Sequence, residues 1–314
     1  MKHIAFMFPG QGSQAVGMGK LFYDEYPEVQ KLYEQANNVL NKDIRALMFE
    51  GPEELLTETE NAQPALLLAS TAIHTLLMKE GIKPAMTVGH SLGEYSALVA
   101  SGSITLDAAL PLVATRGKLM EEAFPKGQGS MAAVLGLGEE DIKSALKKLA
   151  TDEVVDIANL NCPGQIVISG TKEGLEQAGK ILKENGAKRV LPLNVSGPFH
   201  SRLMKSANEE FGTYLKNTVV DDANIPVYAN VSAAPVTKSS EIKELLIKQL
   251  YSPVRFEDSI RHMIEAGVDA FVEVGNGKVL SGLVRKIDRK MPTFSIQDPG
   301  SMKKFIDWYK EEDS

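Results

Sequence analysis

The sequence contains one cysteine, Cys162, among 314 residues, so it can form no internal disulfide. A chain so poor in cysteine fits a reducing compartment, and we expect a cytoplasmic protein. A cysteine metal cluster is excluded, and the five histidines show no two-ligand helical spacing, so we expect no metal site. Lone cysteines are usually inert packing residues, which is the role expected for Cys162.

Long apolar runs are also missing. The longest, residues 64–69 and 129–137, are far too short to span a bilayer, so we expect no membrane segment. The apolar run at residues 4–8 is shorter than a signal-peptide core, and no small-residue cleavage site follows it. We therefore expect no export.

Basic residues are in deficit as well. The chain has 34 Lys and Arg against 41 Asp and Glu, a formal net charge of −7. A nucleic-acid-binding protein normally needs the opposite balance, so we expect no nucleic-acid partner. An acidic protein partner stays possible, because docking depends on a local patch rather than on total charge.

The chain does show an alternation of short apolar strands with amphipathic helices. A strand, a tight glycine turn and a helix in succession are typical of a parallel α/β sheet. The pattern predicts strands at 4–8, 85–88, 226–229 and 270–273, and helices at 26–41, 63–78, 92–100, 240–249 and 279–287. The fold class is therefore predicted to be α/β with a parallel sheet.

Residues 126–196 follow a different order. They predict strands at 130–137, 154–159, 165–169 and 189–194, with helices at 139–149 and 171–185. This β-α-β-β-α-β order is the ferredoxin-like arrangement. We interpret residues 126–196 as a small subdomain inserted into a larger α/β body made of residues 1–125 and 197–314.

The strongest chemical motif is Gly89-His90-Ser91-Leu92-Gly93, a G-x-S-x-G sequence between a predicted strand and a predicted helix. That context is what a nucleophile elbow requires. The turn exposes the hydroxyl of Ser91, and the N–H groups of the following helix face the site, where they would stabilise an oxyanion. His90 is expected to point away from Ser91 and to serve packing or the turn.

A serine hydroxyl needs a base to accept its proton. His200 is the best candidate, because it lies in a turn between a predicted strand and a helix, whereas His74 and His262 lie within helices. A hydrolase triad also needs an acid between serine and histidine in chain order. None of the four aspartates in that interval sits at a strand end followed by a loop, so a neutral group is expected to orient the imidazole.

Two further segments carry candidate functional residues. Residues 8–14 form a glycine-rich turn after the first strand; its spacing fails the dinucleotide fingerprint but fits a loop that supplies oxyanion-binding N–H groups. Arg116 lies in a mainly apolar helical stretch, where an unpaired cation is costly. It is either a snorkelling or salt-bridged side chain or a clamp for a carboxylate.

Together these motifs resemble the malonyl-CoA:acyl carrier protein transacylase family, in its stand-alone bacterial form for fatty acid synthesis. The resemblance covers essentially the whole chain, and the order and intervals of the motifs make it specific. The motifs are residues 9–14, Gly89–Glu94, Thr115–Gly117, Gly197–His200, Gln249–Val254 and Glu273–Gly275. One departure is Asn276, where proline is usual; we expect it to be remote from the chemistry.

The resemblance implies a hydrolase-like body with a ferredoxin-like insert. It implies Ser91 as nucleophile and His200 as base, oriented by the backbone carbonyl of Gln249. The N–H groups of Gln11 and Leu92 would form the oxyanion hole. The substrate-binding residues would be Arg116, which pairs with the malonyl carboxylate, and Gln11, Asn161, Phe199 and Met120.

The implied partners are malonyl-CoA and an acidic acyl carrier protein, with no cofactor. Phe199 fits the malonyl-type pattern, since methylmalonyl-selecting relatives carry a smaller residue there. Three alternatives stay open: a serine esterase or thioesterase that transfers the acyl group to water, an inactive scaffolding module, and a nucleotide-binding enzyme. The first is the main alternative, because it shares the elbow.

Overall fold

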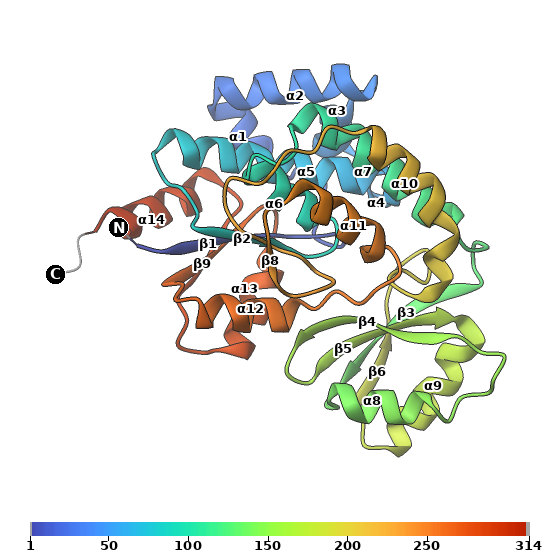
Figure 1. Ribbon diagram of the computed structural model, residues 1–314. Coiled ribbons are helices and arrows are strands. Elements are labelled where there is room, and N and C mark those ends of the chain that lie inside the picture. The colour runs from blue at the N-terminus through green and yellow to red at the C-terminus, as the bar shows by residue number, and fades with distance from the viewer. Residues whose placement is uncertain (1, 312–314) are drawn as a thin grey trace.

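The computed structural model describes residues 2–311 and has two sheets (Figure 1). The larger has six strands in the order β10-β9-β1-β2-β7-β8, parallel except for the pair β7 and β8. The strands are β1 (Ile4–Phe8), β2 (Met86–Gly89), β7 (Val227–Tyr228), β8 (Pro235–Val236), β9 (Ala270–Val274) and β10 (Thr293–Ile296). The parallel sheet confirms the predicted fold class.

Helices cover both faces of this sheet, and β1 shows why. Its five residues are all buried, which is typical of a central parallel strand. Ile4, Phe6 and Phe8 join the core beneath α5 (Thr59–Lys79), α6 (Gly93–Ala100) and α7 (Leu106–Glu122). Ala5 and Met7 join a second core against α12 (Phe256–Glu265) and α13 (Val279–Ile287), on the opposite face in Figure 1.

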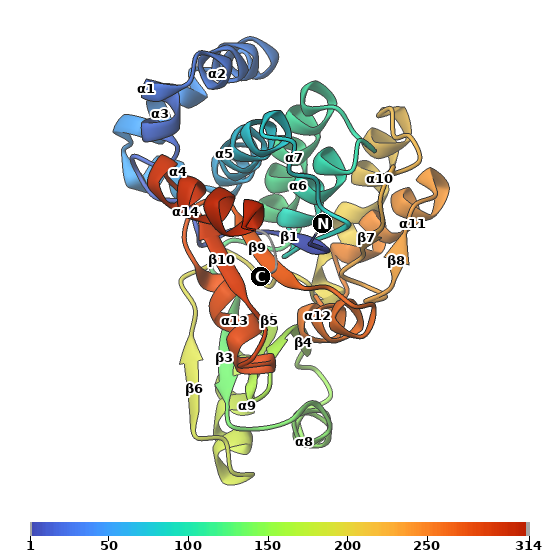
Figure 2. The ribbon, with the colours of Figure 1, turned by 90° about the vertical axis from the view of Figure 1, so that its left-hand side faces the viewer.

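The remaining helices surround this body. Figure 2 shows α1 to α3 stacked outside α5, and α10 and α11 beside α6 and α7. Within the described residues these are α1 (Lys20–Glu25), α2 (Pro27–Leu40), α3 (Ile44–Glu50), α4 (Glu53–Thr57), a 3₁₀ turn (Arg202–Ala207), α10 (Asn208–Asn217), α11 (Ser239–Gln249) and α14 (Pro299–Lys310).

The smaller sheet is antiparallel, in the order β4-β5-β3-β6. With α8 and α9 on one face, it has the predicted ferredoxin-like order of elements. The elements are β3 (Gly129–Leu135), α8 (Glu139–Leu146), β4 (Val155–Cys162), β5 (Gln165–Thr171), α9 (Lys172–Glu184) and β6 (Arg189–Pro192). The division of the chain at residues 126 and 196 stays a prediction.

The small sheet is joined to the body through β4, which pairs with Val254 in the segment before α12. Leu160 N donates to Val254 O at 2.9 Å, and Val254 N donates to Ala158 O at 2.8 Å. The face of the small sheet opposite α8 and α9 contributes Met131 and Val167 to the core of the body. The carboxyl ends of β1 and β2 are level with each other, because Phe8 pairs with Gly89. These contacts bring the loops after β1 and β2 opposite the small sheet.

Candidate active site

Ser91 sits at a sharp turn between β2 and α6. Its φ of 51° lies in the left-handed region, which a non-glycine residue rarely adopts and which is common at functional sites. A Cβ on Gly89 would lie 1.8 Å from Gly93 C, and a Cβ on Gly93 would lie 2.0 Å from Phe8 O. Only glycine therefore fits at both positions, and the motif has the predicted geometry of a nucleophile elbow.

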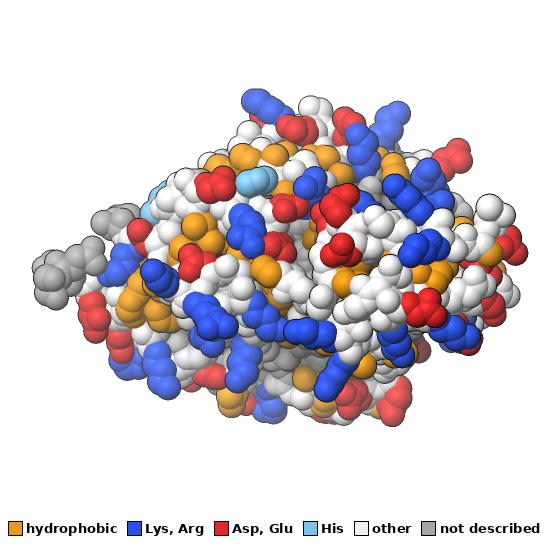
Figure 3. All heavy atoms as spheres, turned by 90° about the horizontal axis from the view of Figure 1, so that it is seen from below, with side chains coloured by type: hydrophobic (Ala, Val, Ile, Leu, Met, Phe, Trp, Pro, Cys, Tyr) orange, Lys and Arg blue, Asp and Glu red, His pale blue; other side chains and the backbone are white. Residues whose placement is uncertain are grey.

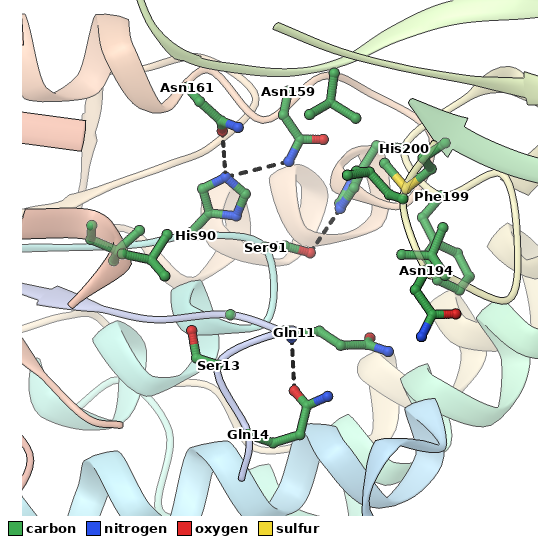
Figure 4. Close-up of a pocket in the computed structure, with 18 of the residues that line it drawn as sticks. Gln11, Ser13, Gln14, His90, Ser91, Asn159, Asn161, Asn194, Phe199 and His200 are labelled. Carbon is green, nitrogen blue, oxygen red and sulfur yellow. Dashed lines mark hydrogen bonds between the residues drawn. The ribbon is translucent and has the colours of Figure 1, made fainter. Parts of the chain in front are cut away.

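The hydroxyl of Ser91 lies 2.7 Å from Nε2 of His200 (Figure 4). His200 comes from the segment after β6 and has a φ of 58°. Its Nδ1 lies 2.8 Å from Gln249 O. A carbonyl oxygen only accepts hydrogen bonds, so Nδ1 carries the proton and Nε2 is left as an acceptor facing Ser91.

The imidazole of His200 is held neutral. Its side chain is only 3% exposed, and burial, with a smaller effect from the positive charge of Arg116, lowers the pKa of His200 to about 3. A neutral imidazole is the form that can accept a proton. The site therefore contains a serine, a base and a neutral orienting group, without a carboxylate on the imidazole.

Arg116 lies in α7 directly behind Ser91 and is fully buried. Its Nη1 donates to Gln63 Oε1 at 2.8 Å, and its Nη2 donates to Gln249 Oε1 at 2.8 Å and to Ser91 Oγ at 3.1 Å. Burial lowers the pKa of Arg116 from its ordinary value. Every acceptor is neutral, so the cation has no direct carboxylate partner within residues 2–311.

Not every N–H group of Arg116 has a hydrogen-bond acceptor. Its Nε is buried and has no hydrogen-bond acceptor in the described part of the chain. The guanidinium carbon lies 5.3 Å from the ring centroid of Tyr95, a cation–π contact that partly compensates the charge. A buried cation with a free N–H next to a nucleophile is suited to an incoming carboxylate.

The backbone N–H groups of Gln11 and Leu92 are both without an acceptor in the described residues. Leu92 follows the nucleophile, and Gln11 lies on the loop after β1, beside the elbow. The side chain of Gln11 donates to Thr59 Oγ1 at 3.1 Å, which fixes that loop on α5. Two unpaired N–H groups of this kind can stabilise an oxyanion.

A cavity of about 250 Å³ opens onto Ser91 and His200 between the two sheets. Four of the predicted substrate-binding residues, Gln11, Met120, Asn161 and Phe199, line it. Arg116 is not a lining residue and reaches the site through its contact with Ser91. The other lining residues include Gly10, Gly12–Gln14, His90, Met131, Asn159, Val167, Leu193–Val195, Val279, Leu280 and Leu283.

Asn161 reaches the site from the small sheet. Its Oδ1 accepts a hydrogen bond from His90 Nε2 at 2.8 Å, and Asn159 Nδ2 lies 3.3 Å from the same nitrogen. Figure 4 shows His90 directed toward these two asparagines and away from Ser91. His90 thus links the elbow to the small sheet, a contact that the sequence did not suggest.

Several contacts of the site were missed by sequence reasoning. The Asn276 side chain donates to Ser13 O at 2.7 Å, and Ser13 lines the cavity. Asn276 therefore supports the cavity wall without lining the cavity, and its expected distance from the chemistry stays a prediction. Two buried residues were also missed. Asn230 donates to Gly89 O in the elbow, and Glu94 accepts from Asn230 N and from Gln249 Nε2. The sequence held one indication of a role for Glu94, namely a carboxylate within a predicted helix that is otherwise mainly apolar.

Across residues 2–311 no group of three or more His, Cys, Asp or Glu side chains is arranged to hold a metal ion. In the same residues, no helix combines the length and hydropathy that crossing a membrane requires.

Known proteins resemble this chain over nearly its whole length. The family described as acyl transferase domain matches residues 5–303. A malonyl CoA-acyl carrier protein transacylase of Bacillus subtilis is 51% identical, covering 99% of both chains. An acyl carrier protein S-malonyltransferase structure from Vibrio cholerae is 44% identical, with a TM-score of 0.95 over 97% of this chain and all of that one.

A further solved structure includes a partner. It is described as a type II PKS acyl-carrier protein in complex with its malonyl-transacylase; the matched chain is 41% identical, with a TM-score of 0.95 over 98% of this chain and 99% of that one. The 51% identity to the Bacillus subtilis relative and the TM-score of 0.95 to the Vibrio cholerae structure are consistent with the site described above, with its nucleophile elbow, its histidine and its buried arginine. The chain belongs to the acyl transferase domain family, among the malonyl CoA-acyl carrier protein transacylases.

Proposed function

We propose that this chain transfers malonyl groups from coenzyme A to the phosphopantetheine thiol of an acyl carrier protein, through an ester on Ser91. The observation that carries the proposal is the set of groups around one atom. Ser91 Oγ has His200 Nε2 at 2.7 Å and Arg116 Nη2 at 3.1 Å. A nucleophile, a neutral base and a cation for the free carboxylate thus converge where the acyl group would be bound.

In the first half-reaction, Ser91 Oγ attacks the thioester carbonyl carbon while His200 Nε2 takes the hydroxyl proton. The N–H groups of Gln11 and Leu92, which have no other acceptor in the described residues, stabilise the oxyanion. The C–S bond then breaks, and the coenzyme A thiolate takes the proton from His200. The enzyme is left as a malonyl ester with a neutral imidazole.

In the second half-reaction the carrier thiol attacks the same carbonyl carbon and gives its proton to His200. When the C–O bond breaks, Ser91 Oγ recovers that proton, and the malonyl group leaves on the carrier. This is a ping-pong mechanism. The product supplies fatty acid or polyketide chain elongation, and we propose that it forms in the cytoplasm without a cofactor, because the thioester itself is the activated acyl donor.

The acidic carrier protein is a partner that the surface can accommodate despite the net charge of −7. Figure 3, which views the molecule from below Figure 1, shows many Lys and Arg side chains across this face, with Asp and Glu side chains between them. The relative whose structure was solved in complex with its acyl-carrier protein is 41% identical to this chain. A local basic surface steers an acidic partner more effectively than overall charge repels it.

Malonyl transfer and hydrolysis can be separated by following radiolabelled malonyl-CoA with and without holo acyl carrier protein. With the carrier present, we expect the label on the carrier. Without the carrier, we expect little free malonate to form after Ser91 has been loaded. The main alternative, a serine esterase or thioesterase, would release malonate at a similar rate in both reactions.

The lowered pKa of His200 predicts an unusual pH profile. Because that pKa is near 3 in the folded protein, His200 stays neutral as pH falls from 7.5 to 5.5. A histidine of ordinary pKa would be mostly protonated at pH 5.5, and acylation would slow by about tenfold. We expect kcat/KM for malonyl-ester formation, measured by rapid quench, to change less than about twofold. A decline with a midpoint near pH 6.5 would contradict this assignment.

A further inference from the structure

Glu94 is a buried carboxylate that the proposed mechanism does not use. It lies in the first turn of α6, three residues after the nucleophile, and is 3% exposed. Its Oε2 accepts hydrogen bonds from Gln249 Nε2 at 2.8 Å and from the backbone N of Asn230 at 3.0 Å. A buried carboxylate is costly unless its contacts compensate the burial, so this one invites an explanation.

Both partners of Glu94 hold parts of the site. Asn230 accepts from Ser91 N at 2.8 Å and donates to Gly89 O at 2.6 Å, so it braces the strained elbow on two sides. Gln249 accepts from Arg116 through its side-chain oxygen and from His200 through its backbone oxygen, each at 2.8 Å. Glu94 therefore contacts the two residues that together position the nucleophile, the base and the cation.

The orientation of the Gln249 amide follows from this arrangement. Both ends of an amide are similar in shape, so hydrogen-bond partners decide which end points where. Glu94 can accept from the NH₂ end, while Arg116 can only donate and requires the oxygen end. In the reversed orientation, the amide NH₂ would face the guanidinium, and the amide oxygen would face the carboxylate. Gln249 Nε2 also donates to Ser91 O and to Asn230 Oδ1, each at 3.1 Å, so Glu94 at 2.8 Å is the nearest of three acceptors that hold the NH₂ end, while Arg116 holds the oxygen end.

We propose that Glu94 is a positioning residue for acyl-group selection: through Gln249 it holds Arg116 in place to receive the substrate carboxylate. The contacts run from Glu94 to Gln249, to Arg116 and on to Ser91 Oγ, each within 3.1 Å. The proposal rests on the proposed function. It differs from a purely structural role, because loss of Glu94 should affect substrates that carry a free carboxylate more than those that lack one.

The test compares malonyl and acetyl loading of Ser91 by rapid quench, for the wild type and for Glu94→Ala and Glu94→Gln. We expect Glu94→Ala to lower the ratio of malonyl to acetyl kcat/KM by about tenfold or more, since small displacements of a positioned group have effects of this order. Glu94→Gln should restore most of the ratio, because its amide oxygen can replace Oε2 as the acceptor for both hydrogen bonds.

Ser96→Ala is the matched control. It removes another buried polar group from α6, one whose hydroxyl has no hydrogen-bond partner in the described residues, and it should leave the ratio unchanged. A double-mutant cycle with Gln249→Ala adds a second criterion. If Glu94 acts through Gln249, adding Glu94→Ala to Gln249→Ala should change the ratio little further.

The outcomes separate this proposal from the proposed function. Wild-type protein that fails to load malonyl groups would overturn both. Normal wild-type loading, with an unchanged ratio in Glu94→Ala or equal losses in the Ala and Gln variants, would overturn the role of Glu94 alone. Fully additive effects of Glu94→Ala and Gln249→Ala would show that Glu94 does not act through Gln249.

Discussion

Replacing His200 with alanine is expected to slow malonyl-ester formation by about 10⁴-fold or more, the order found when a serine enzyme loses its base. Without Nε2 at 2.7 Å, nothing accepts the proton of Ser91 Oγ as it attacks. The oxyanion-binding groups and the bound substrate remain, so some activity should persist. The rate is measured by rapid quench, as malonyl-ester formed at saturating malonyl-CoA.

The left-handed backbone of His200 complicates the alanine variant, since its φ is 58°. His200→Asn is the better second variant, because asparagine tolerates this conformation but cannot act as a base at neutral pH. His262→Ala is the matched control: this histidine is exposed on α12 and bonds to Ala233 O, outside the site. Acylation by His200→Asn within tenfold of the wild-type rate would rule out His200 as the base.

The second large effect concerns Arg116. Arg116→Ala should lower kcat/KM for malonyl-CoA by about a hundredfold or more while keeping or raising that for acetyl-CoA. The malonyl carboxylate loses a charged, hydrogen-bonding partner, whereas acetyl-CoA has no carboxylate to bind. The unused Nε and the lack of a direct carboxylate partner support this selectivity. The measurement is competition between the two thioesters for Ser91.

Controls for Arg116 come from its own helix. Lys118→Ala removes an exposed positive charge two residues away and should leave both rates unchanged. Arg116→Lys keeps a charge but cannot serve Gln63, Gln249 and a carboxylate with one planar fork, so it should recover only part of malonyl loading. Equal losses of malonyl and acetyl transfer in Arg116→Ala would refute the clamp.

The elbow was predictable from the sequence because its constraints are local. Gly89 and Gly93 flank Ser91 within five residues, and Gly89 is required by the neighbouring backbone of Gly93. The contact that requires Gly93, with Phe8 O on β1, is distant in sequence and is seen only in the structure. The strand before them and the helix after them have clear hydrophobic patterns. The ferredoxin-like order of the small sheet was predictable for the same reason, since each of its elements is identified by its own periodicity.

The polar contacts behind the elbow were not predictable in this way. Asn230 N and Gln249 Nε2 reach Glu94 across 136 and 155 residues of sequence, so no local pattern connects them. His200 could be singled out by its place in a turn, but its orientation by Gln249 O came only from the resemblance. The side chain of Gln249, which bonds to Arg116, was missed because the resemblance gave a role only to its carbonyl.

The central claim is that Ser91 becomes a malonyl ester, and intact-mass spectrometry after seconds of exposure to malonyl-CoA tests it most directly. We predict a mass increase of one malonyl group, mapped by proteolysis to the peptide that contains Ser91, removed by addition of holo acyl carrier protein and absent from Ser91→Ala. No adduct on the wild type, or an adduct that persists in Ser91→Ala, would contradict the account.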